Sequence, residues 1–106
     1  MEVLAEVLTA MEPLRRPDLY VVVRLLEKLR SSDRNLNRTQ LQIASGMNYS
    51  QFERYLGLIL QRGLAEMVVN GEGTAGVRLT RKGYDSLMLL VQGLQEILGT
   101  EPFRRQ

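Results

Sequence analysis

Apolar residues recur three or four positions apart in five segments, which are residues 2–12, 19–30, 40–45, 48–62 and 81–98. This spacing places the apolar side chains on one face of a helix, so each segment is expected to form an amphipathic helix. In the second segment the expected inward positions are Leu19, Val22, Val23, Leu26 and Leu29. The pattern therefore predicts a mainly helical chain.

A different pattern separates the last two helical segments. Residues 64–69 end in two β-branched valines, and residues 77–79 alternate between apolar and polar side chains, as strands do. The seven residues between them, NGEGTAG, hold three glycines and begin with Asn-Gly, a common hairpin turn. The fold class is therefore expected to be mainly α with one small β-hairpin.

Several helix boundaries are marked by residues that favour caps. Asp18, Thr39, Asn48 and Thr80 each precede a periodic apolar run, where a side-chain oxygen can accept from the first free backbone N–H groups. A glycine follows each of the two longest helical segments, as is common after a helix C-terminus. These residues predict where four of the helices begin and where two of them end.

The order of the elements predicts an architecture. The short helix of residues 40–45, a turn at Gly46 and the longer helix of residues 48–62 form a helix-turn-helix, with the following hairpin as its wing. The expected divisions are an N-terminal amphipathic helix (1–14), a winged helix-turn-helix domain (18–80), a C-terminal helix (81–99) and a flexible tail (100–106).

The composition argues against catalysis. The 106 residues include neither Cys nor His, which removes thiolate and imidazole metal ligands and the usual pairs of nucleophile and base. No paired constellation of carboxylates, Lys or Ser/Thr replaces them. We therefore expect that the protein is not an enzyme and that it binds neither a metal ion nor a cofactor. No small-molecule ligand is evident from the sequence. No apolar run approaches the roughly 18 residues of a membrane span, and the start lacks a secretion signal, so a cytoplasmic, nucleoid-associated location is expected.

The net charge is only +2, but the charges are unevenly distributed. Residues 1–12 carry three acids and no cation, residues 13–62 carry nine cations against four acids, and residues 63–106 carry five of each. Twelve of the fourteen cations are Arg, whose planar guanidinium suits phosphate and guanine. The helix-turn-helix half is therefore the basic part of the chain.

Three segments in a fixed order carry a family resemblance. TQLQIASGMNYSQFERYL, LQRGLAE and VRLTRKGYDSL resemble the small archaeal winged helix-turn-helix proteins, and in particular the 10a-type chromatin proteins and predicted transcriptional regulators. The resemblance covers residues 19–98. It implies a winged-helix fold, binding to double-stranded DNA, and homodimers in which the C-terminal helices pair antiparallel.

The candidate DNA-binding residues lie on and around the second helix of the motif, which in such domains enters the major groove by its N-terminal half. Gln and Arg can read adenine and guanine there, and free N–H groups at a helix N-terminus favour phosphate. The candidates are Arg34, Arg38, Thr39, Asn48, Tyr49, Ser50, Gln51, Arg54, Tyr55 and Arg78.

Some candidates also have a purely structural explanation. Asn48 and Thr39 are caps first, Gln51 stands at a capping-box position, and Tyr55 suits half-buried packing in the core. The wing tip carries Glu72 and no cation, so it is expected at most to touch the DNA backbone.

The final helix is apolar on more than one side, since residues 87–91 are all apolar. A small domain covers one face of such a helix, so a second face is expected to pack against a partner. The predicted dimer residues are Tyr84, Leu87, Leu90, Val91, Leu94, Ile97 and Leu98. The helix of residues 2–12 is an alternative source of dimer surface.

The leading hypothesis is a homodimeric DNA-binding protein, either a transcription regulator or a chromatin-type protein. The alternative is a winged-helix module that binds another protein within a larger assembly, which the acidic N-terminal segment and the low net charge favour. A sensor with a ligand in the dimer interface is a third possibility, although nothing in the sequence specifies a ligand.

Overall fold

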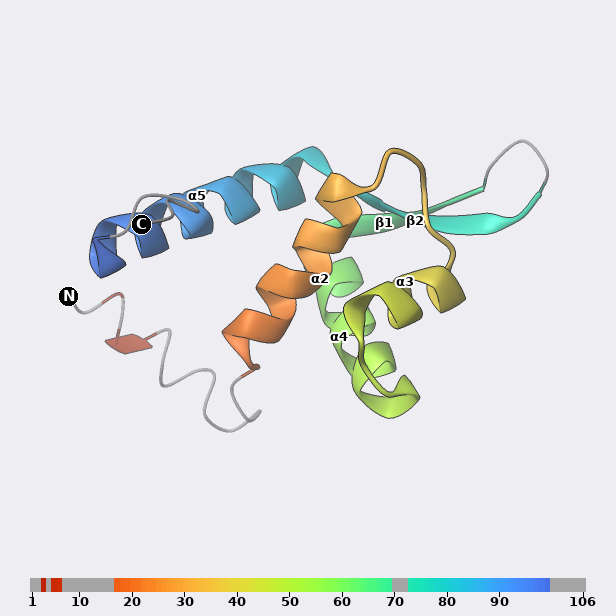
Figure 1. The fold of residues 1–106 in the computed structure, drawn as a ribbon, viewed down its shortest axis with the longest axis horizontal. Helices are drawn as coiled ribbons and strands as arrows, with labels where there is room; N and C mark the ends of the chain where they lie inside the picture. Colours follow the sequence, from red (N-terminus) through yellow and green to blue (C-terminus); the bar gives the residue numbers. More distant parts are fainter. Residues whose placement is uncertain (1–2, 4, 7–16, 70–72, 100–106) are drawn as a thin grey trace, which may run out of the picture.

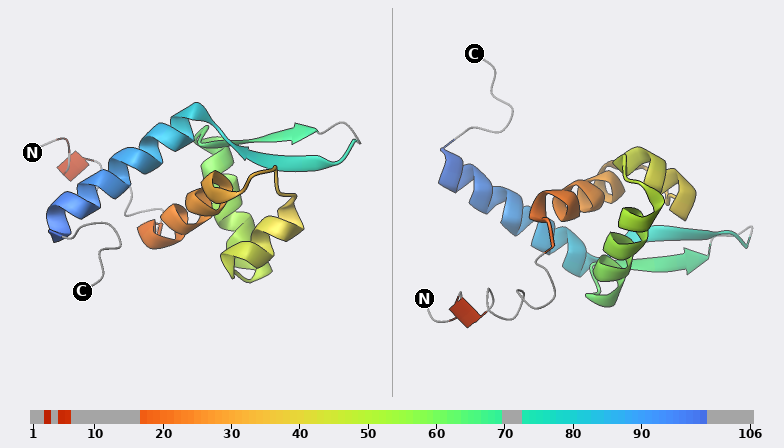
Figure 2. Two further views of the ribbon diagram at one scale, coloured as in Figure 1. Left: turned by 45° about the horizontal axis from the view of Figure 1, so that its top comes forward. Right: turned by 90° about the horizontal axis from the view of Figure 1, so that it is seen from below.

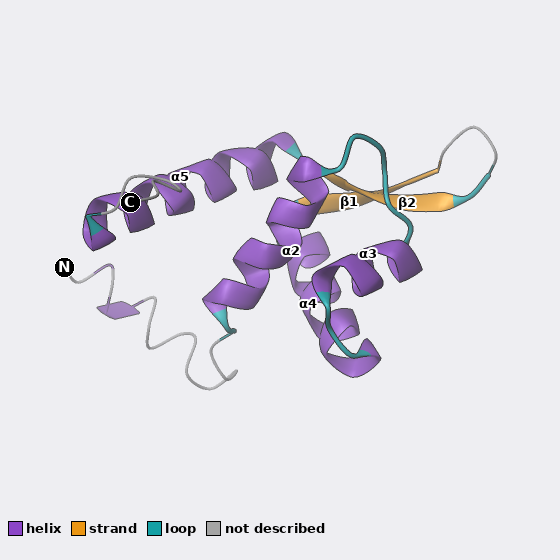
Figure 3. Ribbon diagram, viewed as in Figure 1, coloured by secondary structure: helices purple, strands orange, loops and turns teal. Residues whose placement is uncertain are grey.

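The computed structural model describes residues 3, 5–6, 17–69 and 73–99. In chain order its elements are α2 (Leu19–Ser31), α3 (Arg38–Ser45), α4 (Tyr49–Gln61), β1 (Ala65–Val69), β2 (Ala75–Leu79) and α5 (Arg81–Leu98) (Figures 1 and 3). The predicted fold class, mainly α with a small hairpin in a winged helix-turn-helix, is confirmed. The tail of residues 100–106 and all but three residues of the predicted N-terminal helix lie outside the described residues.

Helix α2 begins at the predicted cap, because the Asp18 side chain accepts from the backbone N–H of Tyr20 at 3.0 Å. Its buried face differs from the predicted one. Val21, Leu25, Leu26 and Leu29 are buried, while Leu19 is 53% exposed. The prediction for Leu19 was wrong because the first helical residue lies at the end of the core, before the neighbouring helices cover α2.

Helix α3 begins two residues earlier than predicted. Asn37, not Thr39, is the N-cap, and it forms a reciprocal capping box with Gln40: the Asn37 side chain accepts from the Gln40 N–H at 2.8 Å, and the Gln40 side chain accepts from the Asn37 N–H at 3.0 Å. Gly46 ends the helix at a φ of 73°, as the predicted tight turn requires.

Helix α4 begins and ends as predicted. Asn48 caps it by accepting from the Gln51 N–H at 2.8 Å. At the other end Gly63 has a φ of 76°, and the N–H groups of Gly63 and Leu64 donate to the carbonyls of Leu60 and Ile59. This pair of bonds is the Schellman motif, which satisfies the last carbonyls of the helix and turns the chain into β1.

The wing is an antiparallel pair in which Ala65 faces Leu79 and Val69 faces Ala75. A third segment joins it, since Val77 donates its N–H to the Leu36 carbonyl at 2.7 Å and makes a bridge with that residue. The pattern of apolar and polar residues does not predict this pairing. This bridge holds the segment between α2 and α3 against the hairpin.

Helix α5 begins at the predicted cap, where the Thr80 hydroxyl accepts from the Gly83 N–H at 2.9 Å and donates to the Gly63 carbonyl at 2.6 Å. Gly83 is required at this point, because a Cβ there would lie 2.0 Å from the Leu64 carbonyl oxygen. The hairpin and the C-terminal end of α5 project from the helical core in opposite directions (Figure 2).

Candidate nucleic-acid interface

The exposed edge of α4 lies at its N-terminal half. Tyr49 is 66% exposed, and Ser50 and Arg54 are exposed as well. On the opposite side Phe52, Leu56 and Ile59 are buried, as the sequence pattern predicted. We call Tyr49, Ser50, Gln51 and Arg54 the reading edge. One face of α4 therefore fixes the helix in the core while the reading edge faces outward.

Arg54 lies against an aromatic ring on this edge. Its guanidinium carbon lies 5.3 Å from the centre of the Tyr55 ring, within the range of a cation–π contact. No ion pair to Arg54 occurs among the described residues. Its guanidinium charge is thus supported by a ring and not neutralised by an acid, which suits an incoming anion or base edge.

Arg38 joins the start of α3 to α4. Its guanidinium donates to the Glu53 carboxylate at 2.5 Å, although the two residues are 15 positions apart in sequence. Both side chains are partly exposed, and such pairs contribute little stability, so the contact can be exchanged for a phosphate at small cost. Thr39, next to Arg38, is exposed and is not the cap.

Tyr55 has the packing role that the sequence also indicated, and its place among the DNA-binding candidates is corrected. Only 3% of the residue is exposed, and its hydroxyl accepts from the Asp18 N–H at 2.7 Å, which ties α4 to the start of α2. A side chain in this position cannot reach a ligand on the surface. Asn48 is exposed and Gln51 is half-buried. Both take part in the cap contact described above, at the N-terminal end of α4.

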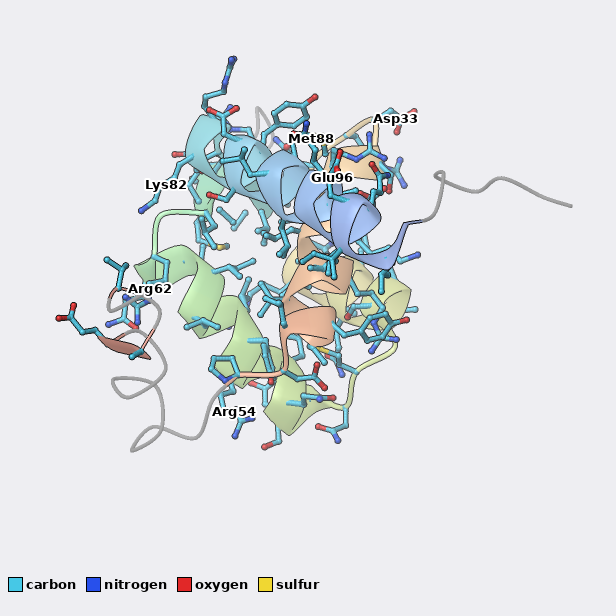
Figure 4. The ribbon with its side chains drawn as sticks, turned by 90° about the vertical axis from the view of Figure 1, so that its left-hand side faces the viewer. Asp33, Arg54, Arg62, Lys82, Met88 and Glu96 are labelled. Atoms are coloured by element: carbon cyan, nitrogen blue, oxygen red, sulfur yellow. The ribbon has the colours of Figure 1, made fainter. Side chains whose placement is uncertain are left out.

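Arg34 and Arg78 do not join the reading edge. Both line a cavity next to the loop of residues 32–35, together with Asp33. Figure 4 shows Asp33 and Arg54 toward opposite ends of the molecule. Arg78 also pairs with Glu66 across the hairpin, with its Nε 2.9 Å from the carboxylate. The predicted DNA contacts therefore divide into two separate groups.

The predicted dimer residues divide as well. Leu87 is fully buried in the core of its own chain, so its assignment to a dimer surface is corrected. Leu90 and Val91 are half-buried, and the others retain exposed surface. The exposed fractions are 42% for Tyr84, 38% for Leu94, 79% for Ile97 and 66% for Leu98, and Leu89, which was not among the predicted residues, is 70% exposed.

Sequence reasoning missed two features near the reading edge. The first is Glu53 as the partner of Arg38, for which a separation of 15 residues leaves no local signal. The second is the Asn37 cap, which the spacing of Asn37 and Gln40 does indicate as a capping box. In the described part of the chain no helix is long and apolar enough to cross a membrane, and no cluster of acids suits a metal ion.

No protein-family model matches the chain, and no curated protein sequence matches it. Solved structures do. A MarR family transcriptional regulator from Silicibacter pomeroyi is 26% identical, with a TM-score of 0.61 over 91% of this chain and 66% of that one. Another MarR family transcription regulator is 23% identical, with a TM-score of 0.62 over 97% of this chain and 72% of that one. The chain thus spans about two thirds of the first regulator.

A third similar structure is Sso10a-2, a DNA-binding protein from Sulfolobus solfataricus. It is 15% identical, with a TM-score of 0.53 over 80% of this chain and 97% of that one. Fold and comparisons together place the chain among the winged helix-turn-helix proteins. The comparisons do not single out the 10a-type proteins that the sequence resembles, because MarR regulators have the same fold.

Proposed function

We propose that this chain is a DNA-binding transcription regulator that inserts α4 into the major groove and acts as a homodimer. The observation that carries the proposal is the reading edge at the N-terminal half of α4. There Arg54, which has no ion pair to any described residue, faces outward on a helix whose other face is buried. The two MarR regulators and the DNA-binding protein with the same fold support it.

Each residue of the reading edge has a distinct role in this proposal. Arg54 is placed to donate two hydrogen bonds to a guanine, and Gln51 to pair with an adenine. Tyr49 and Ser50 stand at the helix N-terminus, where unbonded N–H groups and the helix dipole favour a phosphate. Arg38 releases Glu53 and contacts the backbone, because an exposed ion pair is weak.

The second half of α5 supplies the dimer surface in this proposal. The buried residues of α5 are Gly83 and Leu87, both in its first half. Beyond them Leu89, Leu94, Ile97 and Leu98 expose apolar surface on a helix that projects from the core (Figures 1 and 2). A second copy of the same helix would cover this surface, and two linked half-site contacts raise the overall affinity.

Between a regulator and a chromatin-type protein, the comparisons favour the regulator. The MarR structures are more similar to this chain in sequence and in TM-score than Sso10a-2 is. A cytoplasmic, nucleoid-associated location belongs to the same proposal.

A salt series tests DNA binding. Fluorescence anisotropy with a labelled duplex is expected to show an affinity that falls linearly with salt on a logarithmic plot, because binding releases counterions from the phosphates. Absence of binding even at low salt would overturn the proposal.

The oligomeric state tests the α5 surface separately. Ile97→Asp places a charge on the proposed interface and is expected to give monomers in sedimentation equilibrium, whereas Gln92→Asp, at an exposed polar position of the same helix, leaves the dimer intact. A wild-type protein that sediments as a monomer contradicts the dimer proposal.

The second candidate function is a protein-binding winged helix. Ile43 on α3 is 74% exposed and Tyr49 is 66% exposed, which gives the helix-turn-helix surface an apolar component. In that case Arg38→Glu leaves nucleic-acid binding unaffected. If the surface binds DNA, the same reversal is expected to weaken binding by about tenfold or more, so one variant separates the two functions.

A further inference from the structure

A cavity of about 460 Å³ lies where the end of α2, the loop that follows it, β2 and the first turn of α5 meet. The lining residues belong to two stretches of the chain, residues 29–35 and 77–84. The cavity is separate from the reading edge, since Asp33 in its wall and Arg54 lie toward opposite ends of the molecule (Figure 4). A volume of this size is in the range of small-molecule sites.

Four arginines line the cavity, against a single acid, Asp33. They are Arg30, Arg34, Arg78 and Arg81. The described residues contain eight arginines, so half of them gather here. Guanidinium groups form the strong, planar contacts that phosphate oxygens prefer, and their charge persists at any ordinary pH.

Three of these arginines are held from outside the cavity. Glu27 accepts from Arg30 Nε at 2.9 Å, Glu66 from Arg78 Nε at 2.9 Å, and Asp85 from Arg81 Nε at 3.1 Å. None of the three acids lines the cavity.

In these bonds the donors are Nε and, for Arg30 and Arg78, also Nη2. The Nη1 groups are therefore left for a ligand by the described contacts. These three ion pairs are exposed, so each guanidinium can turn toward a ligand at small cost.

Arg34 differs from the other three. It is exposed, and no ion pair to it occurs among the described residues. Its charge is thus the uncompensated one. The lining also includes the apolar residues Leu29, Val77 and Leu79 and the partly exposed ring of Tyr84. The site therefore combines donors for an anionic group with a surface for a less polar body.

We propose that this cavity binds a phosphate-bearing ligand, with Arg34 as its principal charge partner. The cavity and the reading edge are separate surfaces, so phosphate binding at the cavity is proposed independently of the duplex at α4. The source is either a free phosphate ester or the backbone of a second nucleic-acid segment, and both present the same group. The inference does not depend on DNA binding by α4.

Calorimetric titration of the full chain with inorganic pyrophosphate in about 0.1 M salt tests the site, because that ionic strength screens unspecific attraction over distances beyond about 10 Å. Arg34→Gln is expected to weaken pyrophosphate binding about tenfold through the loss of a charge-assisted hydrogen bond. Arg81→Gln is expected to act in the same direction. Lys28→Gln is the matched control, since Lys28 is an exposed cation of α2 that does not line the cavity.

A repeat titration with saturating duplex identifies the source. If the duplex leaves the pyrophosphate affinity unchanged, the ligand is a free phosphate ester. If the duplex displaces pyrophosphate, and Arg34→Gln weakens that competition, the ligand is nucleic-acid backbone. The proposal is overturned if the wild-type chain does not bind pyrophosphate, or if Lys28→Gln weakens binding as much as Arg34→Gln. Neither result bears on the proposed DNA binding by α4, which the anisotropy measurements test separately.

Discussion

Helices α4 and α5 carry similar sequence patterns but stand in different surroundings. In α4 the apolar residues Phe52, Leu56 and Ile59 are at most 1% exposed. In α5 only Gly83 and Leu87 are buried, and Ile97 near the C-terminal end is 79% exposed. The comparison teaches that an apolar stripe at helical spacing predicts a face that needs cover without saying which molecule provides it.

The largest expected effect compares the two stripes directly. Leu56→Ala removes a fully buried side chain and is expected to lower the free energy of unfolding by about 2–5 kcal/mol through lost burial and a residual cavity. Leu98→Ala is expected to leave the isolated fold unchanged, because Leu98 is 66% exposed. Urea denaturation measures both.

The Leu98→Ala measurement also reports on the partner. If a second copy covers this position, the loss in stability depends on protein concentration, because dissociation is coupled to unfolding. A large loss that is independent of concentration would contradict the assignment of Leu98 to an uncovered end of α5.

The second effect compares glycines within the two helices. Gly83→Ala is expected to destabilise the fold by about 1–3 kcal/mol, since the new Cβ would lie 2.0 Å from the Leu64 carbonyl and α5 must shift. Gly57→Ala in α4 has nothing within 4 Å and is expected to stabilise the fold by about 0.5–1 kcal/mol. Thermal unfolding of the two variants gives shifts of opposite sign, and shifts of the same sign would disprove the close packing at Gly83.

A smaller effect concerns the hydroxyl that connects the two helices. Thr80→Ala removes the cap of α5 and the bond to the Gly63 carbonyl that follows α4, and should lower stability by about 1 kcal/mol. Thr39→Ala is the control, because Thr39 is exposed and α3 is capped by Asn37 instead. If the two variants lost the same free energy of unfolding in chemical denaturation, Thr39 would be a cap after all.

The smallest expected effect is the pH dependence of the Glu27–Arg30 pair on α2, the helix that packs against both α4 and α5. The hydrogen bond from Arg30 lowers the pKa of the Glu27 carboxyl below its ordinary value of 4.5. The pair therefore contributes stability above that value and loses it as the pH falls through the folded-state pKa.

Because both side chains of this pair are about 40% exposed, the contribution is expected to stay below about 1 kcal/mol. The difference in urea midpoint between the wild type and Glu27→Gln should be small at pH 7 and absent at pH 3. A difference that grows on acidification would contradict the direction of the pKa shift.

Much of the fold was predictable because local rules decide it. The caps Asp18, Asn48 and Thr80 and the terminator Gly63 each act within a few residues, and the structure confirms all four. Leu19 was misplaced because its burial depends on where neighbouring helices end, which periodicity does not contain.

The surface groups were less predictable because they are assembled from distant segments. Arg34 and Arg78 lie far apart in sequence, and the bridge between Leu36 and Val77 brings them together. No local sequence pattern predicts this bridge. The hydrogen-bond partner of the Tyr55 hydroxyl likewise comes from far along the chain, since the Asp18 N–H is 37 positions away. Residue type predicted which side chains can bind an anion, but tertiary contacts decided which of them share a face.

The two ends of α4 provide the most direct test of the proposed function. Arg54 lies on the reading edge and Arg62 at the C-terminal end, both exposed and both without an ion pair among the described residues (Figure 4). Anisotropy with a duplex that the wild type binds is expected to show an affinity loss of at least about tenfold for Arg54→Glu and a much smaller loss for Arg62→Glu. Equal losses at the two ends, or none at Arg54, would contradict insertion of α4 by its N-terminal half.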